Sequence, residues 1–388
     1  MPTPFRHPFL DLARERVVIL DGGMGTSLHK YKPTDKDWGY APNGKHLMNL
    51  SDALVYTHPE WIKDIHRGFF AAGCDGVETN TFNASQIVLD DFGMGEKLVE
   101  INRLNIKLAK EAAAEFATPD RPRFVIGSIG PGTKMPSIID PAIWIDFDSL
   151  AEAYRTQIRV MIEERVDAIL IETCFDLLQA KCVAVTAIEE MKRAGVRLPL
   201  MVQLTIIDAN QKMLPGTDVP AALVALEPLD EIDVIGMNCG VGPDLMLDSV
   251  RHLSRHCGKL LSVLPNAGLP ETRGDETYFP MTPTDVAEWL DRFVSEFGVN
   301  IIGGCCGTNK DHLAEVAKRI HGKKPTPRTP KYLPMVSSLL AGQELLTDPR
   351  PLLVGERTNT NGSKKFKQLL EKDDWHGLVE MAREQERE

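Results

Sequence analysis

One pattern constrains the fold of this chain more than any other: an apolar run rich in β-branched residues ends in small or polar residues, and an amphipathic helical stretch follows. The pattern occurs eight times, at residues 17–23, 76–82, 124–130, 168–174, 200–206, 234–240, 260–266 and 300–307. Continuous apolar runs are typical of strands buried on both faces of a parallel sheet. Eight such units predict an α/β fold, a (β/α)8 TIM barrel of ~250 residues or more with insertions. The alternative is a doubly wound open sheet.

Polar motifs mark where several helices begin. Thr57-His58-Pro59-Glu60 and Thr282-Pro283-Thr284-Asp285 both resemble capping boxes with an early proline. The longest insertion, residues 29–57, is polar and contains Lys, Asp, Pro and Gly. We expect it to form an elaborated loop over the mouth of the barrel.

The chain of 388 residues is longer than one barrel needs. After Ile320 the sequence becomes HGKKPTPRTPKYLPM, whose prolines favour an extended linker. We therefore predict a barrel over residues 1–322, a proline-rich linker over 323–350, and the start of a further domain over 351–388. This last part, PLLVGERTNTNGSKKFKQLLEKDD and a charged helix, predicts one strand–turn–helix unit, which cannot close a core alone.

Charge and composition exclude several classes of protein. The chain has 44 Lys and Arg against 55 Asp and Glu, a net charge of −11, so we expect neither a nucleic-acid partner nor an anionic membrane surface. The N-terminus has no signal-peptide core and no run of ~18 apolar residues occurs, which favours a cytoplasmic protein. In that reducing compartment the 7 cysteines should be thiols or metal ligands.

Three cysteines fall where two predicted strands end. Cys239 ends the sixth strand, and Cys305 and Cys306 end the eighth, between glycines that can supply the turn that lets neighbouring side chains converge. The C-terminal ends of the strands build the active site of a TIM barrel. Thiolates select zinc among abundant cytosolic metals, and three of them leave a tetrahedral ion one ligand short, as in catalytic sites. The sequence therefore predicts a zinc site with an open position.

Less specific interpretations of the cysteines stay open at this point. Cys239 alone could simply pack in the core, and Cys305 with Cys306 could form a strained vicinal disulfide. The remaining four are expected to be core residues, namely Cys74, Cys174, Cys182 and Cys257.

Two other kinds of site do not fit the sequence. The turn DGGMGTSL has Leu28 where a third glycine would complete a dinucleotide fingerprint, and no P-loop spacing follows it. None of the 10 histidines falls at a predicted strand end, which argues against a histidine-based metal hydrolase.

Two carboxylates at strand ends suggest a cationic group on the substrate. Asp21 ends the first strand and Glu172 the fourth, too far around the barrel for both to join a metal site on strands six and eight. A substrate ammonium could use both, although either residue could instead pair with a lysine. Backbone N–H groups at Gly22 and the helix starts would suit a substrate carboxylate. Other candidate substrate contacts at strand ends are Thr79, Asn80 and Asn238.

At these residues the sequence resembles the homocysteine S-methyltransferase family. The segments that match its motifs in order are DGGMGT, ETNTF, IGP, IETCFD, GMNCGVGP, NAGLP and GGCCGT, and they span the predicted barrel. The resemblance implies that Cys239, Cys305 and Cys306 bind Zn²⁺ and that Asp21 and Glu172 hold the amino group of homocysteine. Asn266 of NAGLP is a candidate for the fourth zinc ligand when no substrate is bound.

The tail resembles one branch of this family. VGERTNTNGSKKFKQLL is similar to the opening of the pterin-binding barrel that follows the homocysteine barrel in cobalamin-dependent members. The resemblance implies a methyltransferase in which a zinc-activated homocysteine thiolate attacks the methyl group of methylcobalamin, derived ultimately from 5-methyltetrahydrofolate, to give methionine. Cobalamin-binding and folate-binding modules outside this chain would be its partners.

Two other functions remain possible from the sequence. A homocysteine methyltransferase could use a small onium donor such as betaine or S-methylmethionine. More distantly, the barrel could be a non-enzymatic zinc module that docks partners.

Overall fold

The structure is a computed structural model that describes residues 5–207, 209–273, 276–348, 350–352 and 358–387. The chain divides into two compact units, Met1–Gln343 and Glu344–Glu388. The first unit contains the barrel and the second contains the last two helices, and each is described separately.

Eight parallel strands form the central sheet of the first unit, in the order β1, β10, β7, β6, β5, β4, β3, β2. Their bounds are β1 (Val18–Ile19), β2 (Gly76–Glu78), β3 (Phe124–Ile129), β4 (Ala168–Cys174), β5 (Leu200–Leu204), β6 (Val234–Asn238), β7 (Leu260–Leu264) and β10 (Ile301–Ile302). The Asp75 N–H donates to the Ile19 carbonyl across 2.6 Å, which joins the two ends of the sheet. The predicted TIM barrel is confirmed, and the doubly wound alternative is excluded.

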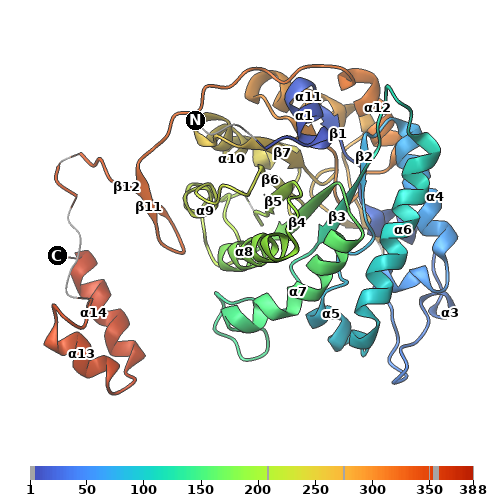
Figure 1. The fold of residues 1–388 in the computed structure, drawn as a ribbon. Helices are drawn as coiled ribbons and strands as arrows, with labels where there is room; N and C mark the ends of the chain where they lie inside the picture. Colours follow the sequence, from blue (N-terminus) through green and yellow to red (C-terminus); the bar gives the residue numbers. More distant parts are fainter. Residues whose placement is uncertain (1–4, 208, 274–275, 349, 353–357, 388) are drawn as a thin grey trace. The chain divides into compact units, whose positions relative to one another are not determined.

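Helices surround the strands, as Figure 1 shows. The main helices that follow the eight strands in turn are α4 (Pro59–Ala72), α6 (Leu98–Phe116), α7 (Phe147–Glu163), α8 (Leu177–Ala194), α9 (Val219–Leu226), α10 (Pro243–His256), α11 (Pro283–Phe297) and α12 (Lys310–Ile320). Shorter elements are α1 (Pro8–Glu15), α2 (Met24–His29), α3 (Asp35–Trp38), η1 (Ser51–Val55), α5 (Gln86–Asp91), η2 (Gly95–Lys97) and the hairpin β8 (Glu271–Arg273) with β9 (Glu276–Tyr278).

The core has two parts, one inside the barrel and one between strands and helices. Alternate strand residues such as Leu20, Ile126 and Leu170 point inward, whereas Val125 and Ile169 belong to the outer core. Helix α1, which the sequence analysis did not predict, adds Phe9 and two neighbours to the inner core and packs Phe9 edge-on against Phe124. Since Phe124 begins β3, α1 covers the N-terminal end of the barrel, and the opposite end stays available for a site.

A recurring polar contact ties neighbouring strands together in pairs at that covered end. An Asp or Asn directly before every second strand accepts a hydrogen bond from a backbone N–H of the preceding strand. The pairs are Asp75 with Ile19 (3.0 Å), Asp167 with Val125 (2.8 Å), Asp233 with Leu200 (2.9 Å) and Asn300 with Leu261 (3.1 Å). These contacts fix the register between neighbouring strands along the barrel axis. They thereby set the positions of the C-terminal strand ends at the mouth of the barrel.

The structure confirms one predicted capping box and shows that the other is wrong. Thr282 caps α11 and exchanges hydrogen bonds with Asp285. Helix α4 instead begins after His58, and the Thr57 hydroxyl donates to the Asp37 carbonyl of the 29–57 insertion. The proline at the first helical position therefore sets the start of α4, while Thr57 anchors the insertion.

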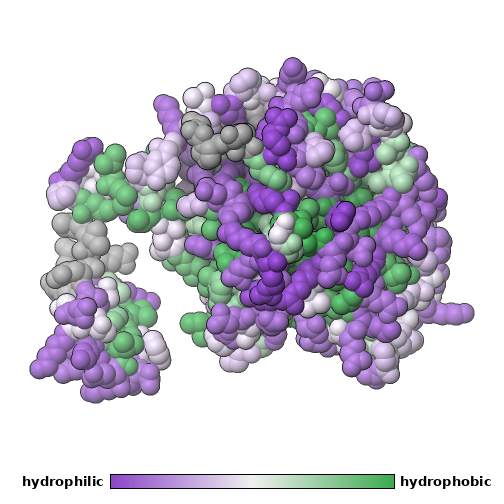
Figure 2. Space-filling model, viewed as in Figure 1, coloured by the Kyte–Doolittle hydropathy of each residue, from purple (hydrophilic) through white to green (hydrophobic). Residues whose placement is uncertain are grey.

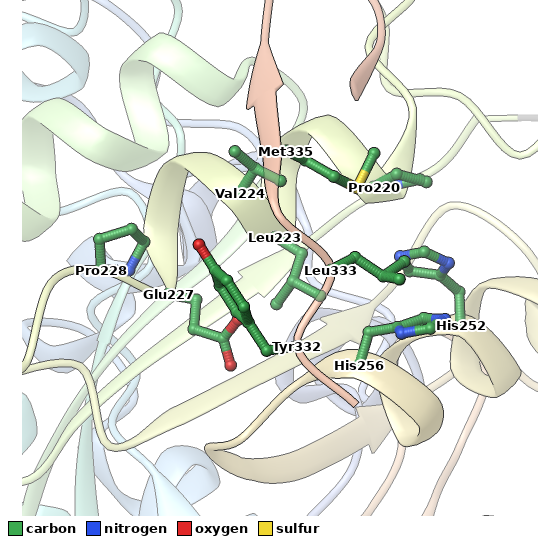
Figure 3. Close-up of a pocket in the computed structure, with 10 residues that line it drawn as sticks. All are labelled: Pro220, Leu223, Val224, Glu227, Pro228, His252, His256, Tyr332, Leu333 and Met335. Carbon is green, nitrogen blue, oxygen red and sulfur yellow. The ribbon is translucent and has the colours of Figure 1, made fainter. Parts of the chain in front are cut away.

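The predicted linker lies along the barrel. Arg328 donates to the carbonyls of Cys257 and Lys259 beyond the end of α10, and the Lys331 N–H donates to the Arg255 carbonyl. The hairpin β11 (Met335–Ser337) with β12 (Gly342–Glu344) follows, and the Asp218 N–H donates to the Leu340 carbonyl. Tyr332, Leu333 and Met335 line a cavity of about 300 Å³ against α9 and α10 (Figure 3).

The second unit, Glu344–Glu388, contains helices α13 (Lys364–Leu370) and α14 (Trp375–Arg387), which contact each other. The strand predicted before them falls largely on residues 353–357, outside the described residues. In the described part of the chain, no helix is long and apolar enough to span a membrane.

The side of the molecule in Figure 2 has hydrophilic side chains over most of the outer helices and hydrophobic ones toward the middle.

Candidate metal and substrate site

The three predicted zinc cysteines converge at the C-terminal mouth of the barrel. The sulfur atoms of Cys239, Cys305 and Cys306 all lie within 4.8 Å of one another, and the Cys239 and Cys306 sulfurs are 3.9 Å apart. All three residues are partly exposed. Cys239 follows β6, and the other two lie in the turn between β10 and α12. The three cysteines are distant in sequence, and their convergence follows from their predicted positions at the ends of the sixth and eighth strands.

Backbone geometry aims these thiols at one point. Cys239 has a left-handed conformation (φ 54°), which a non-glycine residue adopts only where its surroundings hold it. The Cys305 N–H donates to the Pro265 carbonyl, and the Cys306 N–H donates to Asn266 Oδ1 across 3.0 Å. Asn266 therefore supports the turn that presents the cysteines, and its role as a fourth ligand stays a prediction.

Glycines allow the end of β1 to pack against this turn. A Cβ atom on Gly22 would lie 2.7 Å from the Thr308 carbonyl oxygen, and one on Gly303 would lie 2.9 Å from the Asp21 carbonyl oxygen. Gly307 is left-handed (φ 81°) and turns the chain toward α12. Gly22 is thus required by close approach, which brings the Asp21 strand end beside the cysteine turn.

The three sulfurs fit a zinc ion. Ligands at ~2.3 Å in tetrahedral geometry place sulfurs roughly 3.8 Å apart, close to the 3.9 Å between Cys239 and Cys306. Hydrogen bonding from the Cys239 and Cys305 thiols lowers the pKa of Cys306 to about 4. The same cluster raises the pKa of Cys305, through its hydrogen bonds with Cys239 and Cys306, and that of Cys239 to about 12, where the lowering effect of Cys305 is outweighed by the hydrogen bond with Cys306 and by burial. Without a metal ion the cluster therefore favours one thiolate, at Cys306, and a metal that bound all three sulfurs as thiolates would displace two protons.

Two buried carboxyl groups lie at the same mouth of the barrel, that of Asp21 after β1 and that of Glu172 in β4. Asp21 is 1% exposed, and its Oδ1 accepts the Glu78 N–H. Glu172 is 4% exposed, and its two oxygens accept the Ser128 hydroxyl (2.5 Å) and the Asn238 side-chain N–H (2.9 Å). Burial raises the pKa of Asp21 well above its usual range and that of Glu172 to about 7.

Asn238 connects the carboxylate to the cysteine side of the site. Its Oδ1 accepts the Thr173 N–H (2.8 Å), and its Nδ2 donates to Glu172 and to Thr173 Oγ1. Thr173 is left-handed (φ 55°) where the β4 register shifts against β5. The Asn238 Nδ2 lies 4.0 Å from the Cys305 sulfur. Asn238 therefore holds the β4 bulge and orients Glu172 toward the site.

Two predicted substrate residues are placed in a supporting network. Thr79 is buried, with its hydroxyl bonded to that of Thr81 and accepting the Ser128 N–H. Asn80 donates to the Ser51 carbonyl of the 29–57 insertion and to Asn105. The structure does not bring either side chain into the cluster of thiols and carboxyls. Their contact with substrate stays a prediction.

The sequence analysis gave no role to Glu78, which ends β2 beside Asp21. Burial raises its pKa well above the usual range, with further contributions from the charges of Glu172 and Asp21. Its place two residues after Gly76, on the inward face of a strand, is the signal that could have identified it.

The remaining cysteines are core residues, as predicted. Each is at most 1% exposed: Cys74, Cys174, Cys182 and Cys257. All 7 cysteines are free thiols in the structure.

Fold and site together define a (β/α)8-barrel enzyme whose three convergent thiols can hold a metal ion. The model of the family described as homocysteine S-methyltransferase matches residues 18–320. The chain therefore belongs to the homocysteine S-methyltransferase family.

Relatives extend this assignment beyond the barrel. The chain is 38% identical to the methionine synthase of Mycobacterium tuberculosis over 379 residues, which is 98% of this chain but 31% of that protein. It is 37% identical over 383 residues to the methionine synthase of Mycobacterium leprae, again 31% of its length. The chain thus spans about a third of these relatives.

A solved structure shows the same fold. The metallated form of the homocysteine methyltransferase MmuM from Escherichia coli has a TM-score of 0.64 and 19% identity. The match covers 80% of this chain and 98% of the other.

Proposed function

We propose that this chain is the homocysteine-binding module of a cobalamin-dependent methionine synthase and works in the cytoplasm. The observation that supports this most strongly is the meeting of three thiols with buried carboxyl groups that have no cationic partner among the described residues. A thiol-bearing amino acid would satisfy both, because its sulfur suits the metal and its ammonium suits the carboxylates.

Two sets of residues would bind the two ends of homocysteine, its sulfur and its amino group. Cys239, Cys305 and Cys306 would hold Zn²⁺, while Asp21 and Glu172 receive the ammonium. A zinc ion with three thiolate ligands lowers the pKa of a substrate thiol, so that a thiolate is present at neutral pH. Asn238 keeps Glu172 oriented toward the ammonium, and this contact fixes the direction of the substrate sulfur.

The surroundings of the mouth favour a donor carried by protein. Apolar side chains are exposed on the loops that follow four different strands, including Tyr40 (62%), Ile139 (96%), Trp144 (50%), Leu214 (44%) and Leu269 (48%). Exposed apolar groups around a site are typical of a docking surface. The relatives are about three times longer than this chain, which leaves room for further modules. We assign the donor as methylcobalamin on such a module, recharged from 5-methyltetrahydrofolate on a folate-binding module.

A comparison of methyl donors tests this function. Zinc-loaded protein is incubated with homocysteine and one methyl donor at a time. The donors are free methylcobalamin, betaine and S-methylmethionine, and the methionine formed is measured. We expect methionine only with methylcobalamin, and a loss of at least 100-fold in Cys239→Ser. The control is Cys182→Ser, which removes a buried thiol elsewhere. Turnover with betaine or S-methylmethionine alone would favour the small-donor enzyme, and no turnover with any donor would refute the proposal.

A further inference from the structure

Two carboxyl oxygens at the site have no hydrogen-bond partner in the part of the chain that the structure describes. These buried atoms are Oδ2 of Asp21 and Oε1 of Glu78. By contrast, both oxygens of Glu172 accept hydrogen bonds. Buried polar atoms are almost always satisfied, so two unsatisfied oxygens on adjacent strand ends indicate a donor that the protein itself does not provide.

The two residues are adjacent and their charges are not compensated. Asp21 Oδ1 accepts the Glu78 N–H across 3.0 Å, which places the Asp21 carboxyl beside the backbone of Glu78. Among the described residues, no Lys, Arg or His forms an ion pair with Asp21, Glu78 or Glu172. The other titratable groups that face the pair are Glu172 on β4 and Cys74 after α4, both acidic. Like charges this close, without a cation, cannot all ionise.

We propose that Glu78 is a third acidic contact to the substrate ammonium, and that Asp21 and Glu78 share one proton until the substrate binds. This inference rests on the proposed function and adds a residue to it. The substrate arrives as an ammonium with its positive charge intact. The shared proton leaves to solvent, both carboxyl groups become carboxylates, and the ammonium donates to the two oxygens that lacked a partner. Binding of one ammonium is thus coupled to release of one proton.

The burial of the two carboxyl groups agrees with this exchange. Burial is the main cause that raises the pKa of both Asp21 and Glu78, which favours a proton on the pair. A neutral amine would bring no charge to displace it. The pair therefore selects a protonated amine over an uncharged group at the same position.

The test compares two thiols that differ only in the amino group. Homocysteine and 4-mercaptobutanoate are titrated calorimetrically into zinc-loaded protein at pH 7, in buffers with different ionisation enthalpies. The thiol proton is common to both ligands, so the difference in protons released reports the carboxyl pair. We expect a difference of about one proton in the wild type and none in Glu78→Gln. Glu78→Gln should also reduce the preference for homocysteine at least tenfold. Glu152→Gln, an exposed site on α7, is the control and should match the wild type.

Different failures have different meanings. Equal proton release by the two ligands in the wild type would overturn the inference without any variant. An undiminished difference in Glu78→Gln would also overturn it, while homocysteine binding would leave the proposed function intact. If homocysteine does not bind the zinc-loaded wild type at all, the proposed function itself is wrong, and the inference with it.

Discussion

Asn238 shows how a single residue shapes this site. The amide uses its oxygen to hold the backbone of a left-handed threonine and its nitrogen to hold Glu172. A sequence pattern could place Asn238 at a strand end, but could not reveal that it supports another residue. That role depends on the register shift in β4, which brings Thr173 within reach.

Removing the Asn238 amide should separate substrate binding from metal binding. In Asn238→Ala we expect at least tenfold weaker homocysteine binding, because Glu172 loses a partner, with zinc content unchanged. The unpaired Thr173 N–H should also lower the free energy of unfolding by about 1–3 kcal/mol. Zinc analysis and calorimetry measure both effects. Asn102→Ala removes an equally buried amide bonded to the Ala84 and Leu98 carbonyls. This control should lose stability but keep its homocysteine affinity, and a similar affinity loss there would rule out the assigned role.

His66 should make the protein less stable in acid. Neither ring nitrogen has a hydrogen-bond partner among the described residues, and burial lowers the pKa of His66 to about 3. Its pKa in the unfolded chain is ~6.5, so as the pH falls below 6.5 protons favour the unfolded state, by up to about 1.4 kcal/mol per pH unit. Urea unfolding of wild type and His66→Leu between pH 7 and 5 should show this slope only in the wild type. His376→Leu, on the surface, should retain it. Parallel pH profiles for wild type and His66→Leu would disprove this account.

At the scale of elements, the sequence predicted the barrel because each buried strand needs a continuous apolar run. The sequence analysis does not predict helix α1, because it examines the N-terminal residues only for the apolar core of a signal peptide. The apolar residues of this helix in fact fill the barrel interior beside Phe124. The observed strands other than β4 are also shorter than the predicted runs. Asp21 and the three cysteines of the cluster lie beyond the hydrogen-bonded ladder, whereas Glu78, Glu172 and Asn238 lie within their strands.

The Asp and Asn contacts before alternate strands should be important for stability. Asp233→Ala would leave the Leu200 N–H buried without an acceptor and Arg197 without its ion-pair partner. We expect a loss of about 1–3 kcal/mol in the free energy of unfolding. Denaturant unfolding at pH 7 measures this, with the exposed Asp230→Ala as control. Asp233→Asn keeps an acceptor and should lose less, and equal losses in the two Asp233 variants would contradict the hydrogen-bond explanation.

At the scale of the whole molecule, the linker is a structured extension of the barrel. Prolines indicated an extended chain, but the Arg328 contacts with carbonyls beyond α10 depend on tertiary structure that composition does not reveal. The donor could not be determined from the fold for a similar reason. Barrel geometry places the three thiols at the mouth, whereas the proposed donor belongs to a part of the longer relatives that this chain does not cover.

Arg328 should control how firmly the linker is held. In Arg328→Ala the carbonyls of Cys257 and Lys259 lose a charged donor, and we expect faster proteolysis within residues 323–343. The free energy of unfolding of the first unit should fall by about 1–3 kcal/mol. Limited proteolysis with mass spectrometry locates the cuts. The exposed Lys324→Ala serves as control. Unchanged cleavage in Arg328→Ala would show that other contacts hold the linker.

The central claim is that three cysteines of this barrel hold a zinc ion that accepts the sulfur of homocysteine. X-ray absorption at the zinc edge tests it most directly, on zinc-loaded protein before and after homocysteine is added. We expect three sulfur ligands at about 2.3 Å before addition and four after it. A sulfur count that homocysteine leaves unchanged would contradict the claim.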